Sequence, residues 1–454
     1  MNLRSASPRT HRHTVTVRAG EATGERVRLG VYDLMTGTFA TLRTFYYRQA
    51  LDAEALRASL AATLAHYPLL TGRLVRDADR GLSVVCNDAG ALFTESHCDR
   101  PMPEYGPDRS AKPDLRSYIH GVNPFRIVGH DTPLLTVRIT HMRGGGSVLG
   151  IAINHSIVDG SGYLDFLRHW SSVHHGLEHR AAPYARTLLD GVADGAAPGT
   201  QEHSTQYVLV PGRKKFGFIW RVNTRSRRVR TITLRFAADE VRALKEHALA
   251  GLAGRGLVPS TGDALSAHLW KVLAELRARP DHSIERLGMV VGLRSVLRER
   301  IPDGFWGNAV TNVTPALPAG DLRGAPLSDT VAAVREAVSS VTVDRVRDEV
   351  AFLEAQRRAR RAHRVLSRMS LDAFEGTIAL NNVSRLPVYE IDLGAGRPFW
   401  FEYPASTVPW TLLVTPTPVA DGSRDVHFSV PREIAEALVT PEWTKRLHAY
   451  APRG

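Results

Sequence analysis

The chain has 454 residues, more than one hydrophobic core usually serves, so two domains of roughly 200 residues each are expected. Hydrophobic residues make up 43% of the sequence and charged residues 23%, which excludes disorder as the main state. The formal net charge of +12 attracts anions, so it favours nucleic acid, an anionic membrane surface or a phosphorylated cofactor as partner.

The sequence shows few signs of secretion or of a membrane anchor. Cys86 and Cys98 are too few for a disulfide framework, which predicts reduced thiols in a cytoplasmic protein. No apolar run approaches the roughly 18 to 20 residues of a spanning helix. Residues 1–30 lack the apolar core of a secretory signal, whereas the arginines and serines of residues 4–12 leave an amphipathic organelle-targeting leader open. The Ala-, Arg-, Gly- and Asp-rich composition is typical of a GC-rich bacterial genome.

Two elements stand out in the first half of the chain. A helix is predicted over residues 52–66, where Leu56, Leu60 and Leu64 recur every four residues and a proline follows. Residues 147–154 (SVLGIAIN) form a short, mostly apolar, β-branched run that predicts a buried strand. The residues after this run therefore follow a strand end, where loops commonly present reactive side chains.

The segment from about residue 190 to 230 changes in composition. It is rich in glycine and proline and ends in the basic stretch 225–230, which is typical of a connection between domains. The predicted division is a first domain over 1–195, a crossover connection over 196–230 and a second domain over 231–454.

The second half again mixes strands and helices. The pattern predicts a strand over 231–236 and helices over 238–252, 262–278 and 327–341. Strands and helices in both halves indicate an α/β fold built from two domains.

His155 is the centre of the functional hypothesis. A histidine with a pKa near neutrality can take a proton from an alcohol or amine, which makes that group a nucleophile toward a thioester carbonyl. For a lone histidine, a satisfied core residue is the more common explanation.

Asp159 lies four residues after His155, and the sequence alone leaves its role open. On a helical turn the carboxylate would share a face with the imidazole and could orient it. In a loop it could turn inward and brace the segment. The pair could also be a fragment of a metal site, but no third ligand stands at a recognisable zinc spacing, so no metal is expected.

Other functional classes lack their motifs. There is no Gly-x-Ser-x-Gly elbow, no P-loop and no Gly-x-Gly-x-x-Gly after a strand. The basic runs 225–230 and 356–361 have neither interleaved aromatic residues nor a nucleic-acid-binding motif, so nucleic acid is not expected as a partner. His174 and His175 lack evident partners and are interpreted as surface residues.

The stretch His155-Ser156-Ile157-Val158-Asp159-Gly160 resembles the HxxxDG signature of the BAHD acyltransferases. Five further segments resemble family segments and occur in family order: 59–74 (SLAATLAHYPLLTGRL), 86–93 (CNDAGALF), 264–270 (ALSAHLW), 305–308 (FWGN) and 386–398 (LPVYEIDLGAGRP). These segments run from residue 59 to residue 398, and the resemblance as a whole spans about residues 29 to 429, nearly the whole chain.

The resemblance implies two chloramphenicol acetyltransferase-like α/β domains with a solvent channel between them. It implies an acyltransferase of specialised metabolism that moves an acyl group from acyl-CoA, as cosubstrate, to a hydroxyl or amine of a small molecule. His155 would be the general base in mid-channel, no acyl-enzyme would form, no cofactor would be permanently bound, and the protein would be a monomer.

The resemblance also assigns supporting roles. Asp159 would be a structural residue paired with Arg294, and Gly160 would support the same loop. The loop that carries Asp392, Gly394 and Gly396 would be structural, although Leu and Ala replace two family aromatics there.

Further residues are candidates for binding the two substrates. Asn381 stands where family side chains reach the active site and is the oxyanion candidate, with a turn-forming asparagine as the alternative. Val383, in place of a large aromatic, predicts a roomier acceptor side. Arg255, Ser260 and Thr261 are the CoA-binding candidates, because basic and hydroxyl groups near a helix N-terminus suit phosphates. For each of the three, an ordinary surface-loop residue is the alternative.

Two rival functions stay open. A condensation-type relative would use the same base with an acyl donor bound to a carrier protein. A catalytically silent binding protein could also use this fold.

Overall fold

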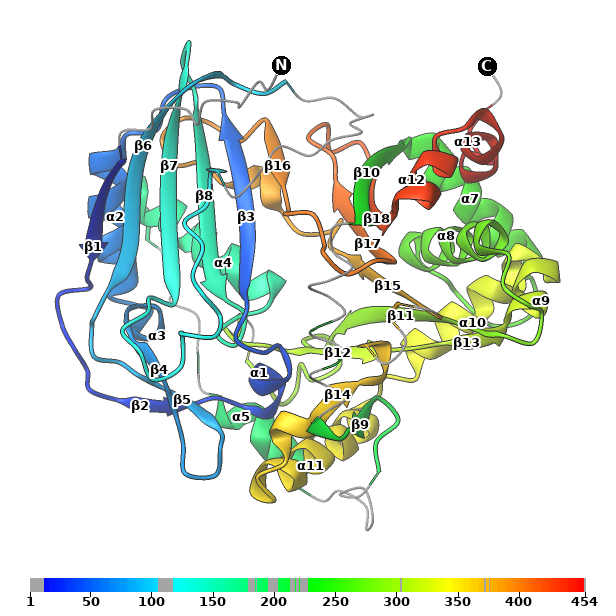
Figure 1. Ribbon diagram of the computed structural model, residues 1–454, viewed down its shortest axis with the longest axis horizontal. Coiled ribbons are helices and arrows are strands. Elements are labelled where there is room, and N and C mark those ends of the chain that lie inside the picture. The colour runs from blue at the N-terminus through cyan, green and yellow to red at the C-terminus, as the bar shows by residue number, and fades with distance from the viewer. Residues whose placement is uncertain are drawn as a thin grey trace.

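The structure, a computed structural model, describes residues 12–104, 117–178, 184, 186–194, 203–212, 217, 220, 228–302, 304–370, 373–374 and 376–452. Two mixed β-sheets, each covered by helices, lie side by side along the long axis of the molecule (Figure 1). Each sheet has its own hydrophobic core. The predicted two-domain α/β architecture is confirmed.

The N-terminal sheet has six strands in the order β1-β6-β7-β8-β3-β16. Two helices, α2 (Ala53–Leu64) and α4 (Gly160–His174), pack against each other and bury their apolar sides in the same core as the strands. The strands are β1 (Arg12–Val17), β6 (Ala91–Pro101), β7 (Leu135–Arg143), β8 (Ser147–Asn154), β3 (Ala40–Tyr47) and β16 (Trp400–Glu402).

Smaller elements complete this half. The helix α3 (Pro68–Thr71) accompanies a three-stranded sheet of β2 (Arg26–Arg28), β5 (Leu82–Val85) and β4 (Arg73–Arg76). The helix α1 (Val31–Met35) also comes from the N-terminal part of the chain, but it buries Val31 and Tyr32 in the C-terminal core.

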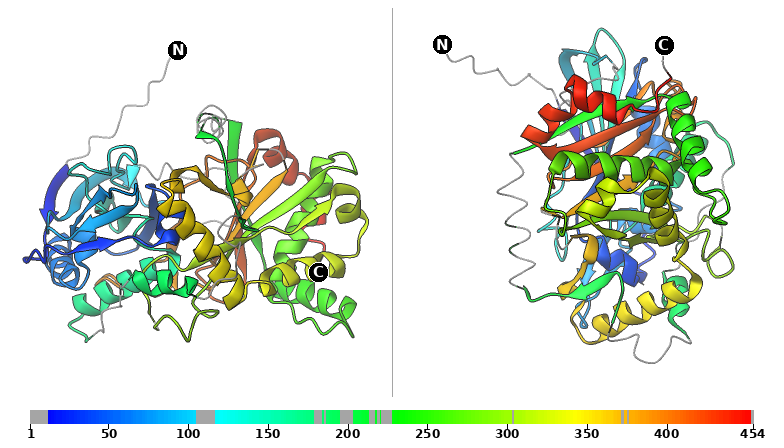
Figure 2. Two further views of the ribbon diagram at one scale, coloured as in Figure 1. Left: turned by 90° about the horizontal axis from the view of Figure 1, so that it is seen from below. Right: turned by 90° about the vertical axis from the view of Figure 1, so that its right-hand side faces the viewer.

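The C-terminal sheet has the order β10-β18-β17-β15-β11-β12, with β13 also paired to β11. Its strands are β10 (Val229–Phe236), β18 (Arg424–Pro431), β17 (Thr411–Pro416), β15 (Thr377–Asn382), β11 (Ile284–Gly292), β12 (Val310–Val313) and β13 (Ala316–Pro318). The helices of this half are α7 (Ala238–Gly251), α8 (Thr261–Arg277), α9 (Ala319–Gly324), α10 (Leu327–Ser339), α11 (Val343–Arg358), α12 (Arg432–Leu438) and α13 (Pro441–Leu447). Figure 2 shows α11 beside the junction of the two halves, near the small pair β9 (Tyr207–Leu209) and β14 (Val365–Ser367) and the short helix α5 (Thr187–Asp190).

The predicted elements of the sequence are confirmed with ends within two residues. Asp52 caps α2 by accepting from the N–H groups of Glu54 and Ala55, and the leucine stripe that predicted this helix is fully buried. Every residue of β8 is buried, as a continuous apolar run suggests.

The chain does not divide cleanly in sequence. β16 pairs with β3 in the N-terminal sheet, and the preceding residues Val388, Ile391 and Leu393 belong to the N-terminal core. A segment of the predicted second domain therefore completes the first. Most of the predicted connection 196–230 lies outside the described residues, so its boundaries stay a prediction. Among the described helices, none is long and apolar enough to cross a membrane.

Candidate active site

His155 directly follows β8, and its surroundings favour the neutral imidazole. Its N–H donates to the carbonyl of Phe39 at 2.8 Å, and part of the residue stays accessible. Nδ1 is buried without a hydrogen-bond partner among the described residues. Burial lowers the pKa of His155 from its ordinary 6.5, and the charge of Arg43 acts in the same direction. The charge of Asp159 opposes this, but the net effect is a lowered pKa, so a neutral ring is available at pH 7.

Residues of the C-terminal half hold the His155 loop. The amide of Asn308 donates at 2.8 Å both to the carbonyl of His155 and to Oδ1 of Asp33. Trp306, two residues earlier, donates from Nε1 to the carbonyl of Gly162 at 2.7 Å. The loop position therefore depends on contact between the two halves of the chain.

Asp159 and Arg294 form an ion pair across this junction. The guanidinium donates to both carboxylate oxygens at 2.7 and 3.1 Å, and the Asp159 side chain is only 2% exposed. The carboxylate also accepts from the N–H groups of Gly162 at 3.1 Å and Ala309 at 3.0 Å. Asp159 is thus the N-cap of α4, and every hydrogen bond of its carboxylate within the described chain goes to these groups. Gly160 begins the helix, where a Cβ would make only ordinary contacts, the nearest at 3.4 Å.

A buried arginine near this loop was missed by the sequence reasoning. Arg43 is 3% exposed and lies between the rings of Tyr163 and Tyr403, with Cζ 3.7 and 4.9 Å from the ring centroids. It donates to the hydroxyls of Tyr403 and Thr41, both at 3.0 Å. Across the described residues no carboxylate pairs with it, although its Nη2 lies 3.5 Å from where a Cβ on Gly160 would stand. In the sequence, this residue could have been recognised as an arginine that precedes the aromatic residues of β3.

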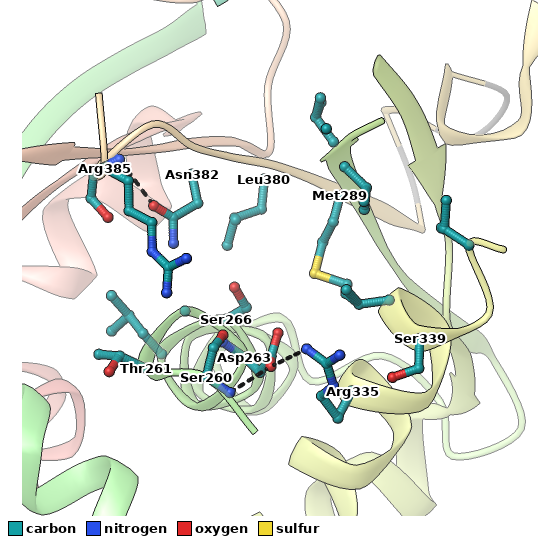
Figure 3. A pocket seen from close by; sticks show the side chains of 18 of the residues that line it. Ser260, Thr261, Asp263, Ser266, Met289, Arg335, Ser339, Leu380, Asn382 and Arg385 are labelled. Carbon is teal, nitrogen blue, oxygen red and sulfur yellow. Dashed lines mark hydrogen bonds and ion pairs between the residues drawn. The ribbon is translucent and has the colours of Figure 1, made fainter. Parts of the chain in front are cut away.

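A solvent-accessible pocket of about 650 Å³ lies in the C-terminal half, between the N-terminus of α8, β11, β15 and α10. Figure 3 shows Ser260 and Thr261 at the start of α8, with Asn382 and Arg385 on the opposite wall. We call this the arginine pocket, because its lining includes Arg335, Arg385 and Arg424. The residues that line the arginine pocket all belong to the C-terminal half, so a passage from the pocket to His155 stays a prediction.

The charge of the arginine pocket suits an anion. Burial lowers the pKa of Arg424, and the neighbouring charge of Arg385 lowers it further, so two guanidinium groups share one region. Arg335 is partly neutralised by Asp263 at 3.3 Å. Ser260 caps α8 by accepting from the N–H of Asp263 at 3.1 Å, which places the positive end of the helix dipole at the pocket.

Two predicted site residues do not join this pocket. Arg255 is about half exposed and pairs with Asp329 at 2.7 Å, and it is not part of the lining. Asn381 stands on β15 between Leu380 and Asn382, which do line the pocket, so strand alternation turns its side chain to the other face.

The loop that carries Asp392 packs against the C-terminal end of α4. The carbonyl of Asp392 accepts from the hydroxyl of Ser171, and its carboxylate accepts from the N–H of Gly394 at 2.9 Å. Gly394 and Gly396 have φ values of +85° and +74°, and a Cβ on Gly394 would stand 2.7 Å from the His174 ring. The substituted residues of this loop, Leu393 and Ala395, are buried in the N-terminal core.

The prediction that His174 and His175 lack partners was wrong, whereas the predicted surface position is confirmed for His175, which is exposed. Nδ1 of His174 lies 3.1 Å from the hydroxyl of Ser59, and Nε2 of His175 lies 3.6 Å from Asp392. Their partners come from distant parts of the sequence, so local inspection could not find them.

Comparison with known proteins agrees with this architecture. The sequence profile of the Transferase family matches residues 9–439. The shikimate O-hydroxycinnamoyltransferase of Nicotiana tabacum is 25% identical over 92% of this chain and 95% of its own length. The hydroxycinnamoyl-CoA:5-hydroxyanthranilate N-hydroxycinnamoyltransferase of Avena sativa is 26% identical over 94% and 97%.

Solved structures share the fold at low sequence identity. TRI101 of F. sporotrichioides, complexed with coenzyme A and T-2, has a TM-score of 0.74 at 16% identity and covers 93% of this chain and 98% of its own. Vinorine synthase has a TM-score of 0.71 at 17% identity, with coverage of 96% and 98%. From the match of the family profile to nearly the whole chain, the protein belongs to the Transferase family, the BAHD acyltransferases, and is an acyl-CoA-dependent acyltransferase that acts on small molecules.

Proposed function

We propose that His155 is the general base of this acyltransferase. Its imidazole accepts the proton of the acceptor O–H or N–H while the acceptor oxygen or nitrogen bonds to the thioester carbonyl. The tetrahedral intermediate then collapses, the C–S bond breaks, and the proton passes to the departing CoA thiolate, with no acyl-enzyme. The observation that carries this proposal is a partly accessible histidine with a lowered pKa on a loop held from both halves. Replacing His155 is its direct test.

The lowered pKa of His155 predicts the pH dependence of the reaction. A general base acts in its neutral form, so kcat/KM should rise with pH through the His155 pKa and then level off. Since burial depresses that pKa, the midpoint of the acid limb should lie below 6.5. A pH profile of kcat/KM with subsaturating acceptor measures this. A midpoint above 6.5 in the free enzyme would contradict the assignment.

We propose Asn381 as the donor to the oxyanion. Its amide can donate an N–H, its side chain is exposed, and none of the described residues bonds to that side chain. Val383, next but one along the chain, is a small apolar group in a position that we assign to the acceptor side.

We propose that the arginine pocket binds the phosphates of acyl-CoA. Ser260 and Thr261 supply hydroxyls and helix N-terminal N–H groups, and Arg385 and Arg424 supply positive charge. A cationic pocket of this size supports free CoA over a carrier-bound donor. The paired and exposed Arg255 is the weaker of the predicted CoA ligands.

The pocket proposal separates two sets of variants. Arg385→Ala and Arg424→Ala should each raise KM for acyl-CoA by about 10-fold or more, because each removes charge-assisted hydrogen bonds. Arg255→Ala is the matched control and should change KM only a few-fold. Initial rates against acyl-CoA at saturating acceptor measure the difference. Equal increases in KM for acyl-CoA in all three variants would show that the arginine pocket does not bind the donor.

We propose further that the acceptor carries a carboxylate, which Arg43 binds. The charge of Arg43 is buried and, within the described chain, faces only hydroxyls and aromatic rings, whereas buried charges are normally paired. The two plant relatives are named for acting on shikimate and on 5-hydroxyanthranilate, both of which are carboxylates.

Matched acceptors test the role of Arg43. In the Arg43→Gln variant, KM for an acceptor carboxylate such as shikimate should rise about 10-fold or more, while KM for its methyl ester should change only a few-fold. Arg43→Lys keeps the charge and should recover part of the loss. A variant that weakens both acceptors equally, together with a lower melting temperature, would make Arg43 a structural brace.

We further propose a monomeric protein in the cytoplasm of a bacterium. The composition supports the bacterial source, and the buried, free Cys86 and Cys98 support a reducing compartment. Light scattering on the purified chain tests the oligomeric state.

A further inference from the structure

Three side chains with metal-ligating atoms meet on the N-terminal sheet, apart from His155 and the arginine pocket. They are Glu95 and His97 on β6 and His141 on β7, and their ligand atoms all lie within 4.8 Å of one another. His97 and His141 stand opposite each other on neighbouring parallel strands, and Glu95 precedes His97 by two residues. Because side chains alternate along a strand, all three project from the same face of the sheet.

The ring of His141 is already oriented by its neighbours. Its Nδ1 lies 3.1 Å from the hydroxyl of Ser147, and its Nε2 lies 3.0 Å from Oε1 of Glu95. The Ser147 oxygen also accepts from the N–H of Leu51 at 3.0 Å, which fixes its position. With the ring proton on Nδ1, His141 donates to Ser147 and keeps the Nε2 lone pair for a metal, the arrangement that histidine ligands commonly use.

We propose that Glu95, His97 and His141 form a zinc-binding site. Two imidazoles and one carboxylate are a donor set that Zn²⁺ uses when a fourth position holds water. Tetrahedral ligands at about 2.0–2.2 Å from zinc lie about 3.4 Å apart, close to the 3.0 Å between Glu95 and His141. His97 is exposed, so its ring can rotate to close the wider separations.

The site lies at the opposite end of β8 from the acyltransferase chemistry. His141 is the strand partner of Ser147, the first residue of β8, and His155 follows the last. His155 lies eight residue steps after Ser147, which is about 26 Å at about 3.3 Å per step along a strand. A zinc ion here links β6 to β7 and stabilises the fold without contact with the base. The proposal is therefore independent of the proposed function.

Zinc titration of the untagged full-length chain, after treatment with a chelator, tests the site. Isothermal titration calorimetry with ZnCl₂ should show one tight site per chain, and zinc should raise the melting temperature. His97→Ala and, separately, Glu95→Gln should weaken this site at least about 10-fold and remove the thermal shift. His282→Ala removes another exposed histidine and is the matched control, which should bind like the parent chain.

The outcomes are distinct. The zinc-site proposal would be wrong if His97→Ala bound zinc as tightly as the parent chain. It would also be wrong if the parent chain bound zinc with a Kd above about 100 µM, which is weak binding. Turnover with acyl-CoA should be equal with zinc and with chelator, so failure of the zinc site leaves the general-base proposal untouched. Loss of turnover in His97→Ala would contradict the separation of the two sites.

Discussion

Replacing His155 by alanine is expected to lower kcat about 100-fold or more, the scale that follows removal of a general base. The acceptor must lose a proton as it attacks, and within the described part of the His155–Gly160 loop no other side chain offers a free base. The Asp159 carboxylate is engaged by Arg294 and two backbone N–H groups, so it cannot take over this role. Stopped-flow or steady-state release of the CoA thiol measures the loss.

Two controls separate chemistry from folding in this experiment. His174→Ala removes a half-buried histidine at the other end of α4 and should keep turnover within a few-fold of the parent. KM for acyl-CoA should stay near the parental value in His155→Ala, because the arginine pocket does not include this residue. Turnover that survives with only a few-fold loss would refute the general-base proposal, and a parent chain without turnover would favour a silent binding protein.

Local patterns in the sequence predicted much of the fold. The leucine stripe of α2 and the unbroken apolar run of β8 are patterns of residues close in sequence. The pattern therefore predicts both the element and the residues that it buries. β16 could not be predicted in this way, because three residues carry no period and their pairing with β3 is set by tertiary contact. No local sequence pattern indicates that this strand joins the N-terminal sheet.

The candidate site likewise contains residues that lie close together in sequence and residues that only the fold brings together. His155 and Asp159 lie only four residues apart, and a contiguous motif identified them. The residues of the arginine pocket come from separate elements, namely Arg335 from α10, Arg385 from the loop after β15 and Arg424 from β18, and only the fold brings them together. Arg255 lies close in sequence to the start of α8, but it pairs with Asp329 and is not among the residues that line the pocket.

Removing the Arg294 side chain is expected to have the largest effect on stability. In Arg294→Met the Asp159 carboxylate, 2% exposed, keeps its two N–H donors but loses its counter-charge. Breaking a buried ion pair in this way typically costs about 3–5 kcal/mol. Arg294 is itself about a quarter exposed, which places the expected loss toward the lower end of that range. The midpoint of urea unfolding, compared with the parent chain, measures it.

A double variant shows whether the effect belongs to the pair. Asp159→Asn keeps an oxygen for the N–H of Gly162 but removes the charge, so Asp159→Asn combined with Arg294→Met should be more stable than Arg294→Met alone. Arg432→Met breaks an exposed pair with Glu436 and is the matched control, which is expected to unfold at nearly the same urea concentration as the parent chain. If Arg294→Met were no more destabilising than this control, the pair would not be what holds the His155 loop.

Because Arg294 also donates to the carbonyls of Phe305 and Gly307, its loss should loosen the segment that carries Asn308, and with it the backbone of His155. Turnover should therefore fall even where the variant stays folded, since the base is held in place from the other half of the chain.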